Sequence, residues 1–166
     1  LQSRLASVRD RPSREFLRRA IANARKAGLE ERTGWPFGAV IVDRDGVVVA
    51  DGSNHVFANF DPTAHAEVQA IRAACASRRV ISLAGCILYS SSEPCPVCLA
   101  AAYWAGVDGV VFAAWAEDAA SINGFDDAYL YALFARPPAS RPLPMLEALR
   151  EEAVEVLKEF DAHAGA

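Results

Sequence analysis

The chain is organised around Thr63-Ala64-His65-Ala66-Glu67 and Glu93-Pro94-Cys95-Pro96-Val97-Cys98. The first stretch places a glutamate two residues after a histidine, and a Cys-x-x-Cys pair begins 28 residues after that glutamate. Zinc prefers thiolate sulfur and imidazole nitrogen in a tetrahedral shell, and a catalytic site uses three protein ligands and leaves the fourth position open. We therefore interpret His65, Cys95 and Cys98 as the ligands of one Zn²⁺ per subunit.

Glu67 is expected to move protons at this metal site. A catalytic zinc lowers the pKa of the water that it binds from about 16 to about 7, so that a nucleophile is available at neutral pH. A neighbouring carboxylate can take a proton from this water, pass it to a ring nitrogen of a substrate and later protonate a leaving amine. The pattern thus predicts hydrolytic chemistry with Glu67 as the catalytic residue.

The Cys-x-x-Cys pair also occurs in structural zinc sites and in redox pairs. A structural site would need a fourth ligand, for which Cys75 and Cys86 are available. Both lie in apolar surroundings, where a free cysteine behaves as a small hydrophobic residue. Neither alternative requires His65 and Glu67 in this spacing, so the joint pattern favours a catalytic site.

The order H-x-E followed by P-C-x-x-C is the signature of zinc deaminases, and the chain resembles the cytidine-deaminase-like superfamily. Within it, the bacterial guanine deaminases are most similar over roughly residues 34–134. This resemblance implies an α/β fold, a three-layer α/β/α sandwich with a mixed β-sheet. The segments that carry it are Pro36-Phe37-Gly38-Ala39-Val40-Ile41-Val42, Asn54, Asp61 to Glu67, Glu93 to Cys98, Tyr103-Trp104-Ala105 and Gly124-Phe125-Asp126-Asp127.

The resemblance also implies roles in substrate binding for residues away from the metal. Asn54 is expected to hold the ring and carbonyl groups of a base, and Asp127 to reach its exocyclic amine or ring nitrogen. Phe37 is expected to pack on the base, and Trp104 to line the pocket, with contact across a dimer interface as one arrangement. Ala66, between the histidine and the glutamate, is assigned to the same pocket.

Residue types alone leave other readings of these positions open. Asn54 suits a turn, whereas Phe37 and Trp104 suit a hydrophobic core. Asp126 suits a helix N-cap, and Glu93 is either a residue that orients the metal ligands or part of an exposed loop. By resemblance, the backbone carbonyls of residues 90–92 are expected to matter more for the substrate than their side chains.

Hydrophobic periodicity and turn residues predict the order of the elements. Asp43 to Gly46 should join two antiparallel strands, and His65 and Glu67 should lie in the first turn of a helix. The strand before Cys95 and the one after its helix should pair in parallel. The expected elements are helix 13–28, ended by Gly28, strand 37–42, a strand from 47 to 56, helix 64–77, strand 86–89, a helix from 95, strand 109–113 and helix 145–162, with Leu146 and Leu149 in the apolar stripe of the last helix.

Length and composition indicate one domain, residues 1–166, with a core over 13–134 and a C-terminal helical segment over 143–162. The net charge of −4, with basic residues concentrated in the first 26 residues and at Arg78-Arg79, disfavours a nucleic-acid partner. We expect the basic N-terminal residues to form a solvated helix face. Four cysteines fit a reducing cytoplasm, and no apolar run is long enough to span a membrane.

Together these observations predict a cytoplasmic zinc aminohydrolase that acts on a free nucleobase, most simply guanine, to give xanthine and ammonia. Azapurines, isocytosine and aminotriazines stay open as substrates, because residues 162–166 lack the terminal aromatic residue with which the resembling enzymes cover the site. A homodimer is expected, with exchange of the C-terminal segment as one form. The alternatives are a tRNA-adenosine-type deaminase and a non-catalytic zinc-stabilised dimerisation module.

Overall fold

The computed structural model describes residues 14–164, so the basic residues before Arg14 and the first residue of the predicted helix 13–28 lie outside the described part. The chain divides into two compact units, Leu1–Tyr129 and Leu130–Ala166. The first unit contains the β-sheet and all the residues predicted for the site. The second consists of helical segments, and the two units are described separately.

A four-stranded sheet in the order β2-β1-β3-β4 forms the centre of the first unit. Strand β1 pairs antiparallel with both β2 and β3, and β4 pairs parallel with β3. The predicted hairpin, the parallel pair and the mixed sheet are therefore confirmed. The strands are β1 (Gly38–Val42), β2 (Val48–Ser53), β3 (Ile87–Ser92) and β4 (Gly109–Ala114).

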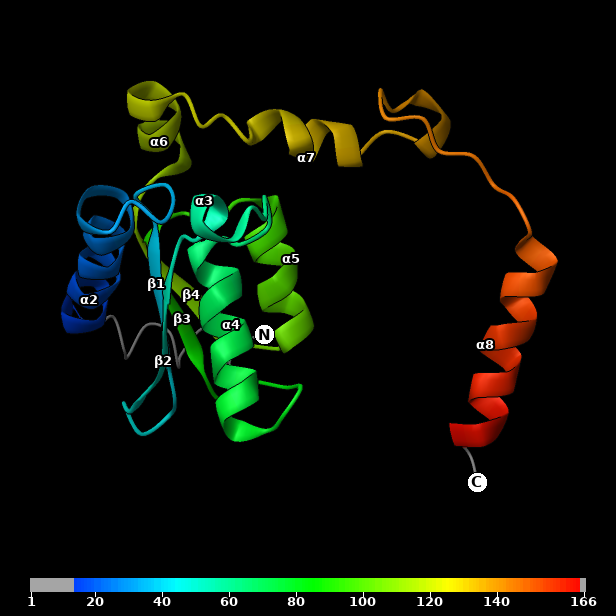
Figure 1. The fold of residues 1–166 in the computed structure, drawn as a ribbon, viewed down its shortest axis with the longest axis horizontal. Coiled ribbons are helices and arrows are strands. Elements are labelled where there is room, and N and C mark those ends of the chain that lie inside the picture. Colours follow the sequence, from blue (N-terminus) through cyan, green and yellow to red (C-terminus); the bar gives the residue numbers. More distant parts are fainter. Residues whose placement is uncertain (1–13, 165–166) are drawn as a thin grey trace. The chain divides into compact units, whose positions relative to one another are not determined.

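Helices cover both faces of this sheet (Figure 1), which confirms the three-layer α/β/α arrangement. Because side chains alternate along a strand, Ile41 and Leu88 pack towards α4 (Ala66–Arg78) and α5 (Pro96–Ala105). Their neighbours Val40 and Tyr89 pack towards α2 (Arg14–Arg25) on the opposite face. The two apolar clusters form the core.

Two glycines allow the helices to approach the sheet closely. A Cβ atom on Gly52 of β2 would lie 2.0 Å from the carbonyl oxygen of Ala66, at the start of α4. A Cβ atom on Gly38 of β1 would lie 2.2 Å from the carbonyl oxygen of Ala20 in α2. Gly52 therefore determines how near the N-terminus of α4 lies to the sheet.

The first helix does not end at Gly28 as predicted. A π-helical turn, η1 (Lys26–Glu30), continues from α2, and the N–H of Glu31 donates to the carbonyl of Lys26 at 2.8 Å. Gly28 is used for packing, since a Cβ atom there would lie 2.7 Å from Cβ of Pro36. A glycine within a helical pattern can thus mark a close contact and not a helix end.

The second strand is shorter than predicted. It ends at Ser53, and Val56–Asn59 forms the short helix α3. The side-chain Oδ1 of Asn54 accepts a hydrogen bond from the N–H of Val56 at 3.2 Å. This contact turns the chain away from the sheet, as asparagine side chains commonly do at turns.

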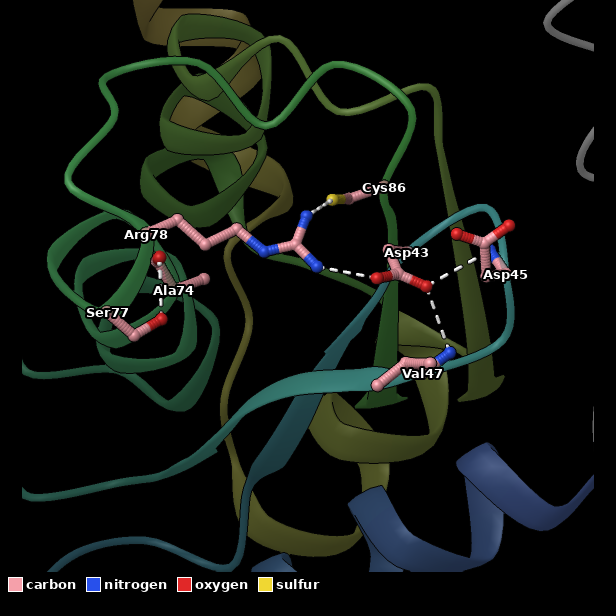
Figure 2. A network of polar contacts seen from close by, with 7 residues as sticks. All are labelled: Asp43, Asp45, Val47, Ala74, Ser77, Arg78 and Cys86. Carbon is pink, nitrogen blue, oxygen red and sulfur yellow. Dashed lines mark hydrogen bonds and ion pairs between the residues drawn. The ribbon is translucent and has the colours of Figure 1, made fainter.

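Helix α4 begins at Ala66, and His65 is its N-cap residue with an extended backbone, so the prediction that His65 lies in the first turn is wrong. At the other end of α4, Arg78 forms an ion pair with Asp43 at 2.5 Å and contacts the sulfur of Cys86 at 3.8 Å. Figure 2 shows that the Asp43 carboxylate also accepts the N–H groups of Asp45 and Val47. These contacts join the β1–β2 turn to α4.

Helix α6 (Ala116–Asn123) follows β4, and α7 (Ala128–Phe134) runs across the boundary between the units. The second unit continues with η2 (Pro138–Ser140) and α8 (Arg150–Ala164). The predicted start of the last helix is wrong, because Leu149 has a left-handed backbone with φ 55°, which does not continue an α-helix. Leu146 and Leu149 therefore precede the helix. Within residues 14–164, no helix is long and apolar enough to cross a membrane.

Candidate active site

The three predicted metal ligands lie together in the first unit. Nδ1 of His65 is 3.4 Å from the sulfur of Cys95 and 3.4 Å from that of Cys98, and the two sulfurs are 3.5 Å apart. Tetrahedral zinc with ordinary bond lengths would separate such donors by roughly 3.6–3.8 Å. The donor set and its spacing therefore fit zinc. Among the described residues, Cys75 and Cys86 do not join this cluster.

Two helix N-termini hold the ligands in place. His65 is the N-cap residue of α4 and Cys95 that of α5, where Pro96 takes the first helical position, which proline favours. Cys98 lies one turn further along α5 and is buried. The starts of the two helices thus bring the three ligands together.

The contact between the two cysteines shifts their pKa values in opposite directions. Hydrogen bonding from Cys98, followed by the contact with His65, lowers the pKa of Cys95 to about 4 despite its partial burial. The same contact with Cys95 raises the pKa of Cys98, and burial adds to the effect. The contact with Cys95 also raises the pKa of His65. A bound metal would hold both cysteines as thiolates, because coordinating thiols are deprotonated.

Glu67 is buried beside these ligands, with 5% of its surface exposed. Its Oε1 accepts a hydrogen bond from the hydroxyl of Ser90 at 2.8 Å, and the thiol of Cys98 lies 3.3 Å from Oε2. Burial raises the pKa of this carboxyl above its ordinary value. A raised pKa makes a carboxyl a better proton acceptor, and a carboxyl beside bound water can both take and give a proton.

Asn54 is buried, and its side-chain oxygen is already engaged. Oδ1 accepts from the backbone N–H groups of Trp35 at 3.1 Å and Val56 at 3.2 Å. Gly34 leaves room for this oxygen, since a Cβ atom there would lie 2.0 Å from it. These two contacts use Oδ1 and leave the Nδ2 amide as the group that can contact a ligand. Asn54 can therefore offer a ligand a donor but not an acceptor.

An aromatic cluster holds the segment that carries Asp127. The ring of Phe125 lies 4.8 Å from that of Trp35 and 5.4 Å from that of Phe37. Burial raises the pKa of Asp127, and the charge of Cys95 adds to this effect. Asp127 is thus close enough to the metal ligands to sense their charge. The sequence indicated Phe37 and Asp127 but not the contacts of Trp35 and Phe125, which link distant segments.

Two polar residues near the cysteines make contacts that the sequence did not indicate. Ser90 was expected to matter through its backbone, but its side chain contacts Glu67. The signal was available, since Ser90 shares a strand face with apolar Leu88 and a buried hydroxyl needs a partner. Glu93 contacts no metal ligand through a described hydrogen bond; its Oε2 accepts the N–H of Ala116 at 3.1 Å, which ties the cysteine loop to α6.

The structure places Trp104 at the surface and Ala66 in the core. Trp104 lies on α5 with 90% of its surface exposed. Ala66 is fully buried and packs in the core between α4 and the sheet. The expected contacts of both residues with a substrate stay predictions.

The fold, the three metal ligands and the buried carboxyl of Glu67 together define a zinc-dependent hydrolytic deaminase. The family described as the cytidine and deoxycytidylate deaminase zinc-binding region matches residues 10–114. The chain belongs to this family, and the predicted zinc cofactor and enzymatic class are confirmed.

Individual relatives make the resemblance more specific. The chain is 48% identical to guanine deaminase of Bacillus subtilis (strain 168) over 132 residues, which cover 80% of this chain and 83% of the relative. An X-ray structure of guanine deaminase from Bacillus subtilis matches with a TM-score of 0.84 and 42% identity, covering 90% of this chain and 94% of that one. A tRNA-specific adenosine deaminase of Aquifex aeolicus (strain VF5) is 32% identical over 145 residues, which cover 87% of this chain and 91% of the relative. The chain is a guanine deaminase homologue, and the tRNA alternative has less support.

Proposed function

We propose that the chain converts guanine and water into xanthine and ammonia. The observation that carries the proposal is the buried Glu67 carboxyl, which contacts Cys98 and so lies beside the metal ligands. The substrate is suggested by the higher identity to a guanine deaminase than to a tRNA-specific adenosine deaminase. The net charge of −4 agrees with a small-molecule substrate.

Glu67 moves the protons of the reaction. His65, Cys95 and Cys98 would hold zinc, which supplies the Lewis acidity that makes water a competent nucleophile near neutral pH. Glu67 takes a proton from the attacking water and delivers it to the ring nitrogen next to the amine-bearing carbon. It then transfers the second proton of that water to the departing amine, so that a C–O bond replaces the C–N bond and ammonia leaves.

The other predicted residues orient the ring. Asn54 donates from Nδ2 to a carbonyl oxygen or unprotonated ring nitrogen, because its own oxygen is engaged by backbone N–H groups. Asp127 accepts from an N–H or amine of the base. Phe37 packs on the ring, Ala66 borders the pocket, and Trp104 contributes from α5. Azapurines, isocytosine and aminotriazines offer similar donor and acceptor groups and are the alternative substrates.

We further propose a cytoplasmic homodimer, with exchange of the C-terminal segment as one form. Tyr103 and Trp104 of α5 are 78% and 90% exposed in the single chain, and large exposed aromatic residues are enriched at interfaces. The four cysteines are free, which suits a reducing compartment. Sedimentation analysis tests the dimer, and cell fractionation tests the location.

Ammonia release from the zinc-loaded chain tests the proposed reaction. The panel contains guanine, 8-azaguanine, isocytosine, ammeline, adenine, cytosine and a tRNA anticodon stem-loop. We expect the highest kcat/KM with guanine. Release from several small rings would mean a less selective pocket, release from the stem-loop alone would favour tRNA editing, and no release at all would contradict the proposal.

The variant Glu67→Gln tests the role of the carboxyl. It keeps the size of the side chain and should keep the bound zinc, but it cannot take up a proton. We expect turnover to fall by about 10²- to 10⁴-fold, the range that general acid–base catalysis contributes. Zinc content measured by elemental analysis is the control, and unimpaired turnover with full zinc would show that Glu67 is not the proton carrier.

A further inference from the structure

Strand β3 presents the hydroxyl of Ser90 to the helix-covered face of the sheet that also carries Leu88. Ser90 follows Leu88 on the side of the sheet that packs against α4 and α5, and only 1% of its surface is exposed. A hydroxyl buried without a partner costs stability. Ser90 has a partner, since its Oγ lies 2.8 Å from Oε1 of Glu67.

The direction of this hydrogen bond follows from the Glu67 carboxylate, because an ionised carboxylate can only accept. The N–H of Ser92 points to Oγ of Ser90 at 3.4 Å, and Oγ can accept this contact while it donates its single proton elsewhere. The carboxylate of Glu67 is the acceptor that remains within reach. Ser90 therefore donates, and Glu67 accepts through Oε1.

The Glu67 carboxyl has two further contacts among the described residues, and only one of them is with another side chain. One is the residue's own backbone N–H, and the other is the thiol of Cys98, 3.3 Å from Oε2. A thiol is a weak donor, and a metal-ligating thiolate has no proton to donate. Ser90 is thus the firmest side-chain anchor of this carboxyl among the described residues. It holds Oε1 and leaves Oε2 on the side of the metal ligands.

We propose that Ser90 is a positioning residue for deamination: its hydroxyl fixes Oε1 of Glu67 so that Oε2 faces the attacking water and the ring. This proposal rests on the proposed function, in which Glu67 carries the protons. Ser90 acts through Glu67 and not on the substrate. A displacement of about 1 Å in a catalytic group can reduce the rate about 10²-fold, so loss of this anchor should appear in kcat.

The matched variants Ser90→Thr and Ser90→Val test the role of the hydroxyl. Threonine and valine have nearly the same size and shape, and only threonine can donate to Glu67. We expect Ser90→Thr to retain kcat and Ser90→Val to lower it by about 10- to 100-fold, the usual cost of removing a group that orients an active-site residue. KM and zinc content should stay unchanged in both. Equal kcat values would overturn the proposal.

A second measurement does not depend on turnover. Crystal structures of the zinc-loaded variants should show the Glu67 carboxylate hydrogen-bonded to Thr in Ser90→Thr and displaced or in several rotamers in Ser90→Val. An unmoved carboxylate in Ser90→Val would overturn the proposal. If valine prevents folding, Ser90→Ala removes the hydroxyl without added bulk and is compared with Ser90→Thr in both measurements. A wild-type chain inactive on the whole panel would instead contradict the proposed function, while the crystal comparison still decides the role of Ser90.

Discussion

At the scale of single residues, two adjacent carboxylates offer a matched comparison. Asp127 is partly buried and senses the charge of Cys95, whereas Asp126 is exposed and accepts the N–H of Ala128 at 3.0 Å. We expect Asp127→Asn to lower kcat/KM for guanine by roughly 10- to 100-fold, because a hydrogen bond to a charged group contributes about 1.5–3 kcal/mol. Steady-state kinetics of the zinc-loaded variants measure this.

Asp126→Asn is the control for this change. Asparagine keeps the side-chain oxygen that accepts from Ala128, so the start of α7 is preserved while the charge is removed. We expect kcat/KM to stay near the wild-type value. Equal losses in both variants would mean that the charge of the segment matters and that Asp127 has no specific contact with the base.

The candidate metal ligands could be predicted because each lies at or near the start of a helix. His65 and Cys95 each stand directly before a helix, and the sequence indicates both helix starts. The orientation of Asn54 and the role of Ser90 depend on contacts between separate elements. Oδ1 of Asn54 is engaged by the N–H of Trp35, and Ser90 reaches Glu67 only because β3 packs under α4. Sequence spacing contains no direct information on such packing.

At the scale of elements, Gly52 and Gly38 allow helices to pack closely on the sheet. Substitutions at these two positions should separate an effect on stability from an effect on metal binding. Gly52→Ala would place a methyl group 2.0 Å from the carbonyl of Ala66 and push the start of α4 outward. Overpacking of this kind typically costs about 1–3 kcal/mol. Because His65 caps α4, we expect zinc affinity to fall together with stability. Urea unfolding and competition with a zinc chelator measure the two effects.

Gly38→Ala provides the matched control on the opposite face. Its methyl group would lie 2.2 Å from the carbonyl of Ala20 in α2, which carries none of the metal ligands. We expect a comparable loss of stability with zinc affinity retained. The interpretation of Gly52 would be wrong if both variants lost zinc affinity equally.

The ion pair at the C-terminal end of α4 predicts a pH-dependent contribution to stability. The N–H of Val47, followed by Arg78, lowers the pKa of Asp43 below its ordinary value. A carboxyl whose folded pKa is depressed stabilises the fold above its unfolded pKa of about 3.9, and this stability is lost as the pH falls through the folded value. Asp43→Asn should therefore lower the free energy of unfolding at pH 7 by about 1 kcal/mol, since the pair is only partly buried.

Urea unfolding at pH 7 and at a pH below 4 measures this contribution. The difference between wild type and Asp43→Asn should shrink at the lower pH. Asp45→Asn, in the same turn, removes a charge without removing an acceptor of the network and should change stability by less than about 0.5 kcal/mol. A difference that is the same at both pH values would contradict the assignment.

Element types were easier to predict than their ends. The hairpin and the parallel strand pair follow from apolar runs and turn residues. In the π-helical turn after α2, Gly28 packs closely against Pro36, and α8 starts after Leu149, whose backbone is left-handed. The first feature depends on a tertiary contact and the second on a single backbone angle. Hydrophobic periodicity in the sequence contains no information on either.

At the scale of the whole molecule, the metal site should contribute to folding. Its ligands come from the starts of α4 and α5, and the first and the last ligand are separated by 33 residues of chain. A ligand that binds only the folded state stabilises it by about 4 kcal/mol when its free concentration is 1,000 times Kd. For a chain of this size that corresponds to a change in Tm on the order of 10 °C.

Thermal unfolding of the zinc-loaded and chelator-treated chain measures this stabilisation. We expect zinc removal to lower Tm and added zinc to restore it. Cys95→Ser should abolish the zinc-dependent change, because a hydroxyl is a poor substitute for a thiolate ligand. Cys75→Ser should keep it, because Cys75 lies outside the metal cluster. If verified removal of the metal left Tm unchanged, the two helix starts would be held together by packing alone, and zinc would serve the chemistry without contributing to the fold.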